Sequence, residues 1–205
     1  MIKLIEPLWW INLLGDLNSW MVNNSQLVYR IPKFADLFIL TYPIYLLVLY
    51  IYGIVKREIY YKKSALFIFI STVLSFAGNI FIQLFVDKVR PNVILGLVDR
   101  KNETILHRFM PSSSFPSDHA AVSMWIAVAS VVRWMKNNDK KFIRFGVILI
   151  IFSLLTWFAR ITAAVHWPTD IIAGSVIWIL IPILIWNKKI YRYFDKYFTM
   201  IARLI

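Results

Sequence analysis

Long apolar runs constrain this chain more than any other feature of its sequence. They cover about residues 35–55, 64–86, 117–134, 145–164 and 169–186. An apolar run of about 20 residues is long enough to cross a bilayer as a helix, which makes all its backbone hydrogen bonds within itself. Since 60% of the 205 residues are hydrophobic and only 17% are charged, the sequence predicts an all-α integral membrane bundle and not a soluble domain.

The N-terminal segment has a different pattern. From Leu8 to Met21, apolar side chains gather on one helical face and polar side chains on the other. This pattern is typical of an amphipathic helix that lies in the membrane interface, where tryptophan is also favoured. We therefore expect one membrane-embedded domain with an interfacial N-terminal segment (1–34), a transmembrane core (35–186) and a basic cytoplasmic tail (187–205).

The net charge of +12 follows the order of the apolar runs. Lys and Arg gather at 56–63, at 133–144 and in the tail, and these segments are nearly free of acids. Basic connections stay in the cytoplasm, so the positive charge indicates membrane topology and contact with anionic lipid headgroups, and not a nucleic-acid partner. The absence of cysteine excludes disulfides, thiol chemistry and zinc–thiolate sites.

Polar residues gather where the apolar runs end on the opposite, extracytoplasmic side. They are Arg90, Ser117, His119, Arg160, His166 and Asp170. Ionisable residues at the ends of membrane spans are costly to bury and indicate a functional site. Ser117 can cap the helix that follows it, and a helix N-terminus attracts anions. Arginine presents a planar fork of donors that fits phosphate oxygens.

Two histidines in this group can divide the work of a phosphate transfer. His166 lies four residues before Asp170, so the carboxylate can fix the tautomer of an attacking imidazole. His119 can then protonate the leaving group. A metal site built from both histidines and Asp170 or Asp118 is the alternative, but the neighbouring arginines would repel a cation. We therefore expect no metal and no other cofactor.

Three motifs carry a resemblance to a known family. Arg90-Pro91, Pro116-Ser117-Asp118-His119 and Arg160-x5-His166-x3-Asp170 resemble, in order and spacing, the signatures of the type 2 phosphatidic acid phosphatase superfamily. The resemblance implies a helical core shared with vanadium haloperoxidases and a metal-independent reaction. It implies that His166 is the nucleophile, that Asp170 orients it and that His119 is the acid. It implies phosphate binding by Arg90, Arg160 and Ser117.

The sequence also departs from the family pattern. The first motif usually has Lys seven residues before its Arg, where this chain has Gln83; Lys88 is a candidate substitute for binding phosphate. Asp118 replaces a small residue, and Ala159 replaces a Ser. Asp118 and the missing Lys resemble the bacterial undecaprenyl-pyrophosphate phosphatases of the bacitracin-resistance type. The family core commonly has six spans, whereas this chain offers five and the amphipathic helix.

The resulting hypothesis is a lipid phosphatase of the bacterial cytoplasmic membrane with an extracytoplasmic active site. The expected substrate is undecaprenyl pyrophosphate, converted to the monophosphate through a phosphohistidine. Phosphatidylglycerol phosphate and the 1-phosphate of lipid A are the alternatives, and transfer to a second lipid is possible because any acceptor can intercept a phosphohistidine. A hypothesis from another class is a non-catalytic protein that binds or transports lipid headgroups. The expected partners are a phospholipid or polyprenyl-phosphate substrate and the bilayer.

Overall fold

The computed structural model describes residues 6–96, 113–136, 139–185 and 188–204, and all regular elements in these ranges are helical, as predicted. The elements are α1 (Leu8–Val22), α2 (Leu27–Leu37), the 3₁₀ turn η1 (Phe38–Leu40), α3 (Thr41–Val55), α4 (Ile59–Phe85), α5 (Pro91–Leu95), α6 (Asp118–Lys136), α7 (Lys140–Thr162), α8 (Pro168–Ile185) and α9 (Lys188–Leu204).

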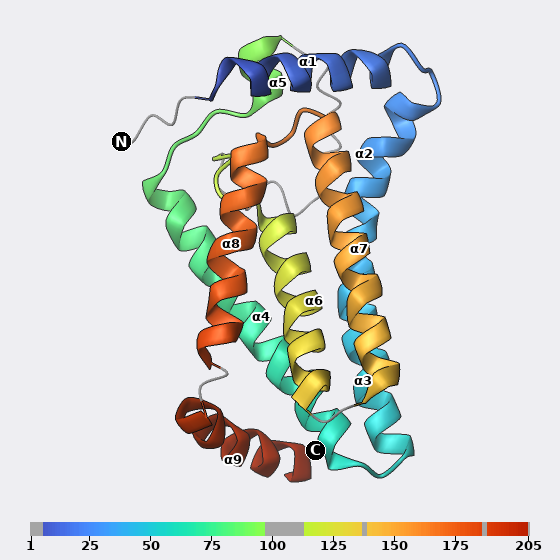
Figure 1. Ribbon diagram of the computed structural model, residues 1–205, viewed down its shortest axis with the longest axis vertical. Helices are drawn as coiled ribbons and strands as arrows, with labels where there is room; N and C mark the ends of the chain where they lie inside the picture. The colour runs from blue at the N-terminus through green and yellow to red at the C-terminus, as the bar shows by residue number, and fades with distance from the viewer. Residues whose placement is uncertain (1–5, 97–112, 137–138, 186–187, 205) are drawn as a thin grey trace.

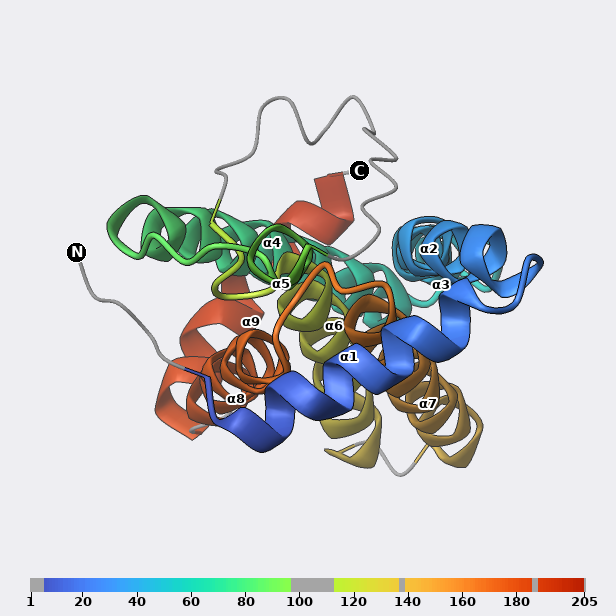
Figure 2. The same cartoon turned by 90° about the horizontal axis from the view of Figure 1, so that it is seen from above.

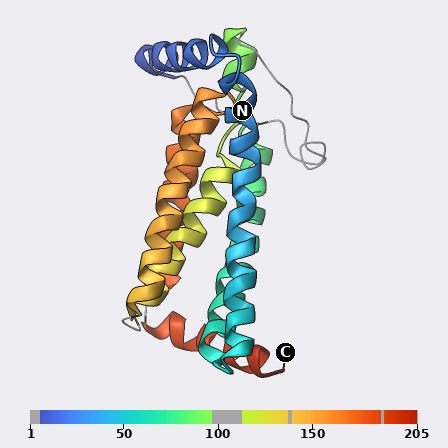
Figure 3. The same cartoon turned by 90° about the vertical axis from the view of Figure 1, so that its right-hand side faces the viewer.

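The long helices run side by side, and a shorter helix lies across each end of the bundle (Figure 1). Helix α1 crosses one end, above α6, α7 and α8, as the view from above shows (Figure 2). Helix α9 crosses the other end, close to the turn between α3 and α4 (Figure 3). Hereafter these are the site end and the α9 end.

Helix α6 lies at the centre and packs against α4, α7 and α8. Its buried face carries several small residues, namely Ala120, Ala121, Ser123, Ala127, Ala129 and Ser130. Small side chains let membrane helices approach closely, which is where these helices gain packing energy. The contact with α7 depends on Gly146, where an added Cβ would lie 2.6 Å from a methyl carbon of Val131.

Within the described ranges, three helical segments are long and apolar enough to cross a membrane: Leu27–Val55, Ile59–Phe85 and Ile143–Thr162. Pro168–Ile179 is a shorter apolar segment. The sequence predicts a further span at helix α6, which lies at the centre of the bundle. Its side chains face other helices, so that buried Ser130 and Arg133 find protein partners and not lipid.

Several helix boundaries differ from the predicted ones. The first spanning segment begins at Leu27 and not near residue 35. Within this segment, the 3₁₀ turn η1 contains Ile39. In a regular α-helix the carbonyl of Ile39 would accept a hydrogen bond from the amide of residue 43. Residue 43 is proline and has no N–H, so the helix is disturbed in the turn before it. Helix α4 begins at Ile59, inside the predicted basic loop, and the predicted tail forms helix α9.

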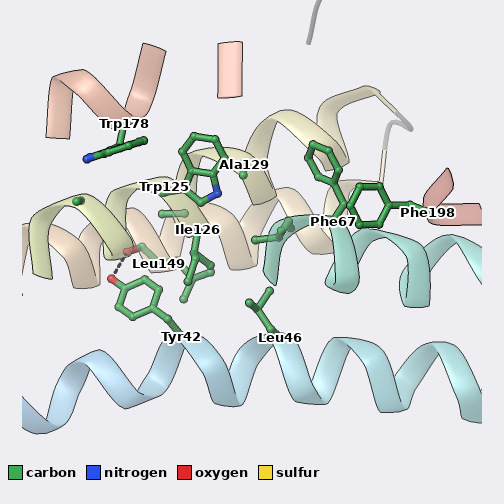
Figure 4. Packing of buried hydrophobic residues seen from close by; sticks show 12 residues of the cluster. Tyr42, Leu46, Phe67, Trp125, Ile126, Ala129, Leu149, Trp178 and Phe198 are labelled. Atoms are coloured by element: carbon green, nitrogen blue, oxygen red, sulfur yellow. Dashed lines mark hydrogen bonds between the residues drawn. The ribbon is translucent and has the colours of Figure 1, made fainter. Parts of the chain in front are cut away.

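The apolar core ties α3, α4, α6, α7, α8 and α9 together (Figure 4). Its aromatic side chains also place their polar tips on partners. The Tyr42 hydroxyl donates to the carbonyl of Leu149 (3.0 Å), and Trp125 Nε1 donates to Ser71 Oγ (3.0 Å). A buried aromatic side chain whose polar atom is hydrogen-bonded has a fixed orientation in the core, since hydrogen bonds are directional and apolar packing is not. This core holds the site ends of α6, α7 and α8 in a fixed arrangement.

Candidate active site

The predicted site residues all lie at the site end of the bundle. Ser117 precedes α6 and its carbonyl accepts from Ala121 (3.0 Å), Arg160 is in the last turn of α7, and Asp170 is in the first turn of α8. The amide of Ser117 donates to the carbonyl of Asp170 (3.1 Å), which joins the second motif to the third. This approach requires Gly174, where an added Cβ would lie 2.8 Å from the carbonyl oxygen of Ser117.

His166 is buried, and its two nitrogens have different neighbours. Nδ1 lies 2.9 Å from the carbonyl oxygen of Ser114, which can only accept a hydrogen bond. Nε2 lies 3.3 Å from Nη2 of Arg160, which can only donate. Together these neighbours assign the proton to Nδ1 of a neutral imidazole and leave a lone pair on Nε2. The nitrogen suited to attack therefore faces a guanidinium group.

Asp170 lies close to His166 but does not make the hydrogen bond to Nδ1 that the sequence suggested. Its Oδ2 is 3.7 Å from Nδ1 and accepts from the amide of Trp167 (2.9 Å). Since the carbonyl of Ser114 is the nearer acceptor, the backbone fixes the tautomer, and the carboxylate acts on the ring by its charge. The sequence could not indicate Ser114, because every residue offers a carbonyl.

Several buried polar atoms at the site lack a hydrogen-bond partner among the described residues, and two of them, Arg160 Nε and Ser117 Oγ, can donate to an anion. The rest of the Arg160 guanidinium is engaged, since Nη1 donates to Asp36 Oδ1 (2.6 Å). Arg90 Nη1 donates to the carbonyl of Val165 (3.1 Å), the residue before His166. Buried polar groups are normally paired, so unpaired groups beside two arginines indicate a site for a polar, anionic ligand.

His119 occupies the first turn of α6 and is partly buried. The residue before it, Asp118, is one of the departures from the family pattern, and its contacts account for another, Gln83. Its Oδ1 accepts from Asn79 Nδ2 (2.5 Å) and from Gln83 Nε2 (3.0 Å). The two unusual residues, Gln83 and Asp118, therefore contact each other, since an amide can hold a carboxylate at this position.

Lys88 reaches the site from the side of the carboxylates. Its Nζ donates to Asp170 Oδ1 (2.7 Å) and Thr169 Oγ1 (2.7 Å), and it forms an ion pair with Glu6. In this arrangement the ammonium group is engaged with acidic residues, in contrast to the phosphate contact predicted for it. The sequence did not single out Glu6 or Asp36, because each pairs with a residue far away along the chain.

No group of three His, Cys, Asp or Glu side chains that could hold a metal ion occurs in the part of the chain that the structure describes. Independence from metals stays a prediction, which a chelator tests directly.

Comparison with known proteins gives the class of this protein. A family profile described as the PAP2 superfamily matches residues 64–194, which include all three motifs. The chain belongs to the PAP2 superfamily and is a membrane phosphatase acting on lipid phosphates. It is similar to the undecaprenyl-diphosphatase BcrC of Bacillus subtilis (strain 168), with 28% identity over 165 residues that cover 79% of this chain and 75% of the relative. No solved structure matches the chain.

Proposed function

We propose that this protein removes the terminal phosphate of undecaprenyl diphosphate through a phosphohistidine formed on His166. The observation that carries the proposal is that His166 Nε2, the nitrogen assigned the lone pair, lies 3.3 Å from Nη2 of Arg160. A phosphoryl group bound by this guanidinium would lie next to the attacking nitrogen, and positioning of this kind supplies much of the catalysis in phosphoryl transfer.

In the first step, Nε2 bonds to the terminal phosphorus, and the bond from phosphorus to the bridging oxygen breaks. His119 gives its proton to that oxygen, so that the lipid monophosphate leaves. Arg90, Arg160 and the Ser117 hydroxyl bind the phosphoryl oxygens, where negative charge must be held as the bond breaks. The positive end of the α6 dipole favours the same charge.

In the second step, water attacks the phosphohistidine while His119 takes a proton from it. The bond between phosphorus and Nε2 breaks, inorganic phosphate leaves, and both histidines return to their starting states. Since His166 must be neutral and His119 protonated at the start, the rate should fall at both low and high pH. In both steps the histidines and water supply every proton and bonding atom, and no step uses a metal ion. We therefore expect the activity to persist in chelator.

The choice of a polyprenyl diphosphate rests on similarity. The curated relative is named an undecaprenyl-diphosphatase, and the match covers most of both chains. The residues of the proposed site would bind phosphate groups and not lipid tails, so they fit other lipid phosphates as well. Phosphatidylglycerol phosphate and lipid A therefore belong in any assay of substrate preference.

The site end should face the outside of the cytoplasmic membrane. Support comes from the α9 end, where Lys63 and Arg133 lie near Asp195 and where the C-terminal helix adds further cations. Basic segments remain in the cytoplasm. Since the chain lacks cysteine, single variants at exposed positions test this orientation. A membrane-impermeant maleimide should label Asn23→Cys in intact cells and Lys56→Cys only after lysis; the reverse pattern would invert the topology.

The activity is tested by measuring phosphate release by the purified protein in detergent with chelator present. The substrates are undecaprenyl diphosphate, phosphatidylglycerol phosphate, phosphatidic acid and lipid A, with His166→Ala as the control. Fastest release from undecaprenyl diphosphate, lost in the variant, is the expected result. A different preferred lipid would correct the substrate. Headgroup binding that persists in His166→Ala without any turnover by either protein would favour a non-catalytic binding protein.

A further inference from the structure

A buried cluster of charged side chains joins the N-terminal segment to Asp170. Lys88 Nζ donates to Asp170 Oδ1 (2.7 Å) and pairs with the carboxylate of Glu6. Thr169 completes the cluster, because its hydroxyl accepts from Lys88 and donates to Glu6. The side chains of Lys88 and Glu6 are only 4% and 5% exposed. A buried charge is strongly unfavourable without its partner, so each member of this cluster depends on the others.

The backbone of Lys88 reaches His166 by a second route. The carbonyl of Lys88 accepts from the amide of Ser114 (2.8 Å), and the amide of Lys88 donates to Ser113 Oγ (3.3 Å). Ser114 in turn provides the carbonyl that lies 2.9 Å from His166 Nδ1. Lys88 therefore holds both groups beside Nδ1, namely the Ser114 carbonyl through its backbone and the Asp170 carboxylate through its ammonium group.

We propose that Lys88 is a positioning residue for His166 and that Glu6, from the N-terminal segment, completes the active site as the counter-ion of Lys88. The role rests on the proposed nucleophile. The ammonium group partly offsets the charge of Asp170, which would otherwise favour a proton on Nε2 and remove the attacking lone pair. Glu6 limits this effect, because its negative charge opposes part of the field that the Lys88 ammonium group exerts on Asp170 and His166.

Two variants should shift the pH at which His166 loses its proton in opposite directions. Arg160 and Asp170 lie next to His166, and Arg90 contacts the residue before it. Asp36 pairs with Arg160, Asp118 interacts with both arginines, and Lys88 and Glu6 lie behind Asp170. His119 occupies the first turn of α6 at the same end of the bundle. Lys88→Met leaves Asp170 unopposed, so His166 should hold its proton up to a higher pH, by about one pH unit. Glu6→Gln removes the more distant anion, so the proton should be lost at a lower pH, by a smaller amount.

The experiment combines kinetics with NMR of ¹⁵N-labelled histidine, which follows the protonation of His166 without substrate. Assignment uses the signal that is absent from His166→Ala. We expect kcat of Lys88→Met to fall by about 100-fold, as for a misplacement of about 1 Å, with KM changed less than about threefold. Lys63→Met is the matched control, since Lys63 pairs with Asp195 (2.9 Å) at the α9 end and should leave the titration of His166 unchanged.

The double variant Glu6→Gln, Lys88→Met protects the test against a folding failure, because it removes both charges of the pair. His166 in the double variant should lose its proton at a higher pH than in the wild-type protein but at a lower pH than in Lys88→Met, because the lost cation is nearer to Asp170 than the lost anion is to His166. An unchanged titration in Lys88→Met, or in the double variant where the single one does not fold, would overturn the proposal. So would a rise in KM with weaker vanadate inhibition at constant kcat, which would make Lys88 a phosphate ligand. Loss of the undecaprenyl diphosphate assignment would not affect the NMR result, so the two failures are distinguishable.

Discussion

Two buried arginines at opposite ends of the bundle differ in how completely their guanidinium groups are paired. Each side chain is only 3% exposed. At the α9 end, Arg133 Nε donates to Ser64 Oγ (2.9 Å), its guanidinium lies over the Tyr60 ring, and Nη2 is 3.8 Å from Asp195. At the site end, Arg160 Nη1 and Nη2 contact Asp36 and His166, while Nε has no partner among the described residues.

The difference separates a structural arginine from one available to a ligand. Arg133 satisfies its donors with protein groups and thereby ties α6 to α4 and α9. Arg160 directs one donor at the imidazole and leaves another unpaired, which is costly in a buried place unless a ligand accepts from it. Burial alone would not distinguish the two residues, whereas their hydrogen bonds do.

The largest expected effect comes from replacing each of these two arginines in a separate variant. Arg160→Gln should lower kcat/KM by about 10³-fold, because loss of an arginine at a transferring phosphoryl group costs on the order of 10³ to 10⁵. Arg133→Gln should change kcat/KM less than about threefold and lower stability by about 2 kcal/mol. Kinetics and thermal unfolding in detergent measure both quantities. Equal losses of activity in the two folded variants would remove the distinction between the ends.

A smaller effect is expected from the glycines at which helices approach most closely. Gly174→Ala would push a methyl group against the carbonyl of Ser117, and Gly146→Ala would push one against Val131. Overpacking costs about 1 to 3 kcal/mol in either place, so unfolding temperatures should fall in both variants. Only Gly174→Ala should also reduce kcat, by roughly tenfold, because it displaces the start of α6. An equal loss of kcat in Gly146→Ala would show that the site is not locally held.

The smallest effect concerns two buried serines, because activity should change here without the loss of stability expected at the glycines. Ser117→Ala removes a hydroxyl that lacks a partner among the described residues, and kcat/KM should fall by about 10-fold, as for one lost hydrogen bond to a charged group. Ser130→Ala removes a hydroxyl that already donates to the carbonyl of Ile126 (2.6 Å), and activity should be unchanged. If Ser117→Ala retains full activity, the Ser117 hydroxyl does not bind phosphate.

The sequence predicted the gathering of polar residues because membrane topology constrains them strongly. Apolar runs must cross the bilayer, so the ends of alternate runs meet on one side, and the site end contains Ser117, Arg160, His166 and Asp170. The amphipathic pattern of the N-terminal segment likewise predicted α1, which extends from Leu8 to Val22.

Contacts between distant segments were not predictable in the same way. Nothing in the local sequence connects Glu6 with Lys88 or Asp36 with Arg160, since charged residues near apolar runs have many possible partners. The sequence predicts a tail for the basic C-terminal segment, because charge dominates its pattern. The segment forms α9, which docks through Asp195 on Lys63 and through Phe198 on Phe67.

The most direct test of the account is to trap the covalent intermediate. Undecaprenyl diphosphate labelled in its terminal phosphate is mixed with the purified protein and quenched on the millisecond timescale. The account predicts protein-bound label that is stable in alkali and labile in acid, as a phosphohistidine is, and that is absent from His166→Ala. Turnover without bound label at any time, or equal label in His166→Ala, would contradict the assignment of His166 as the nucleophile.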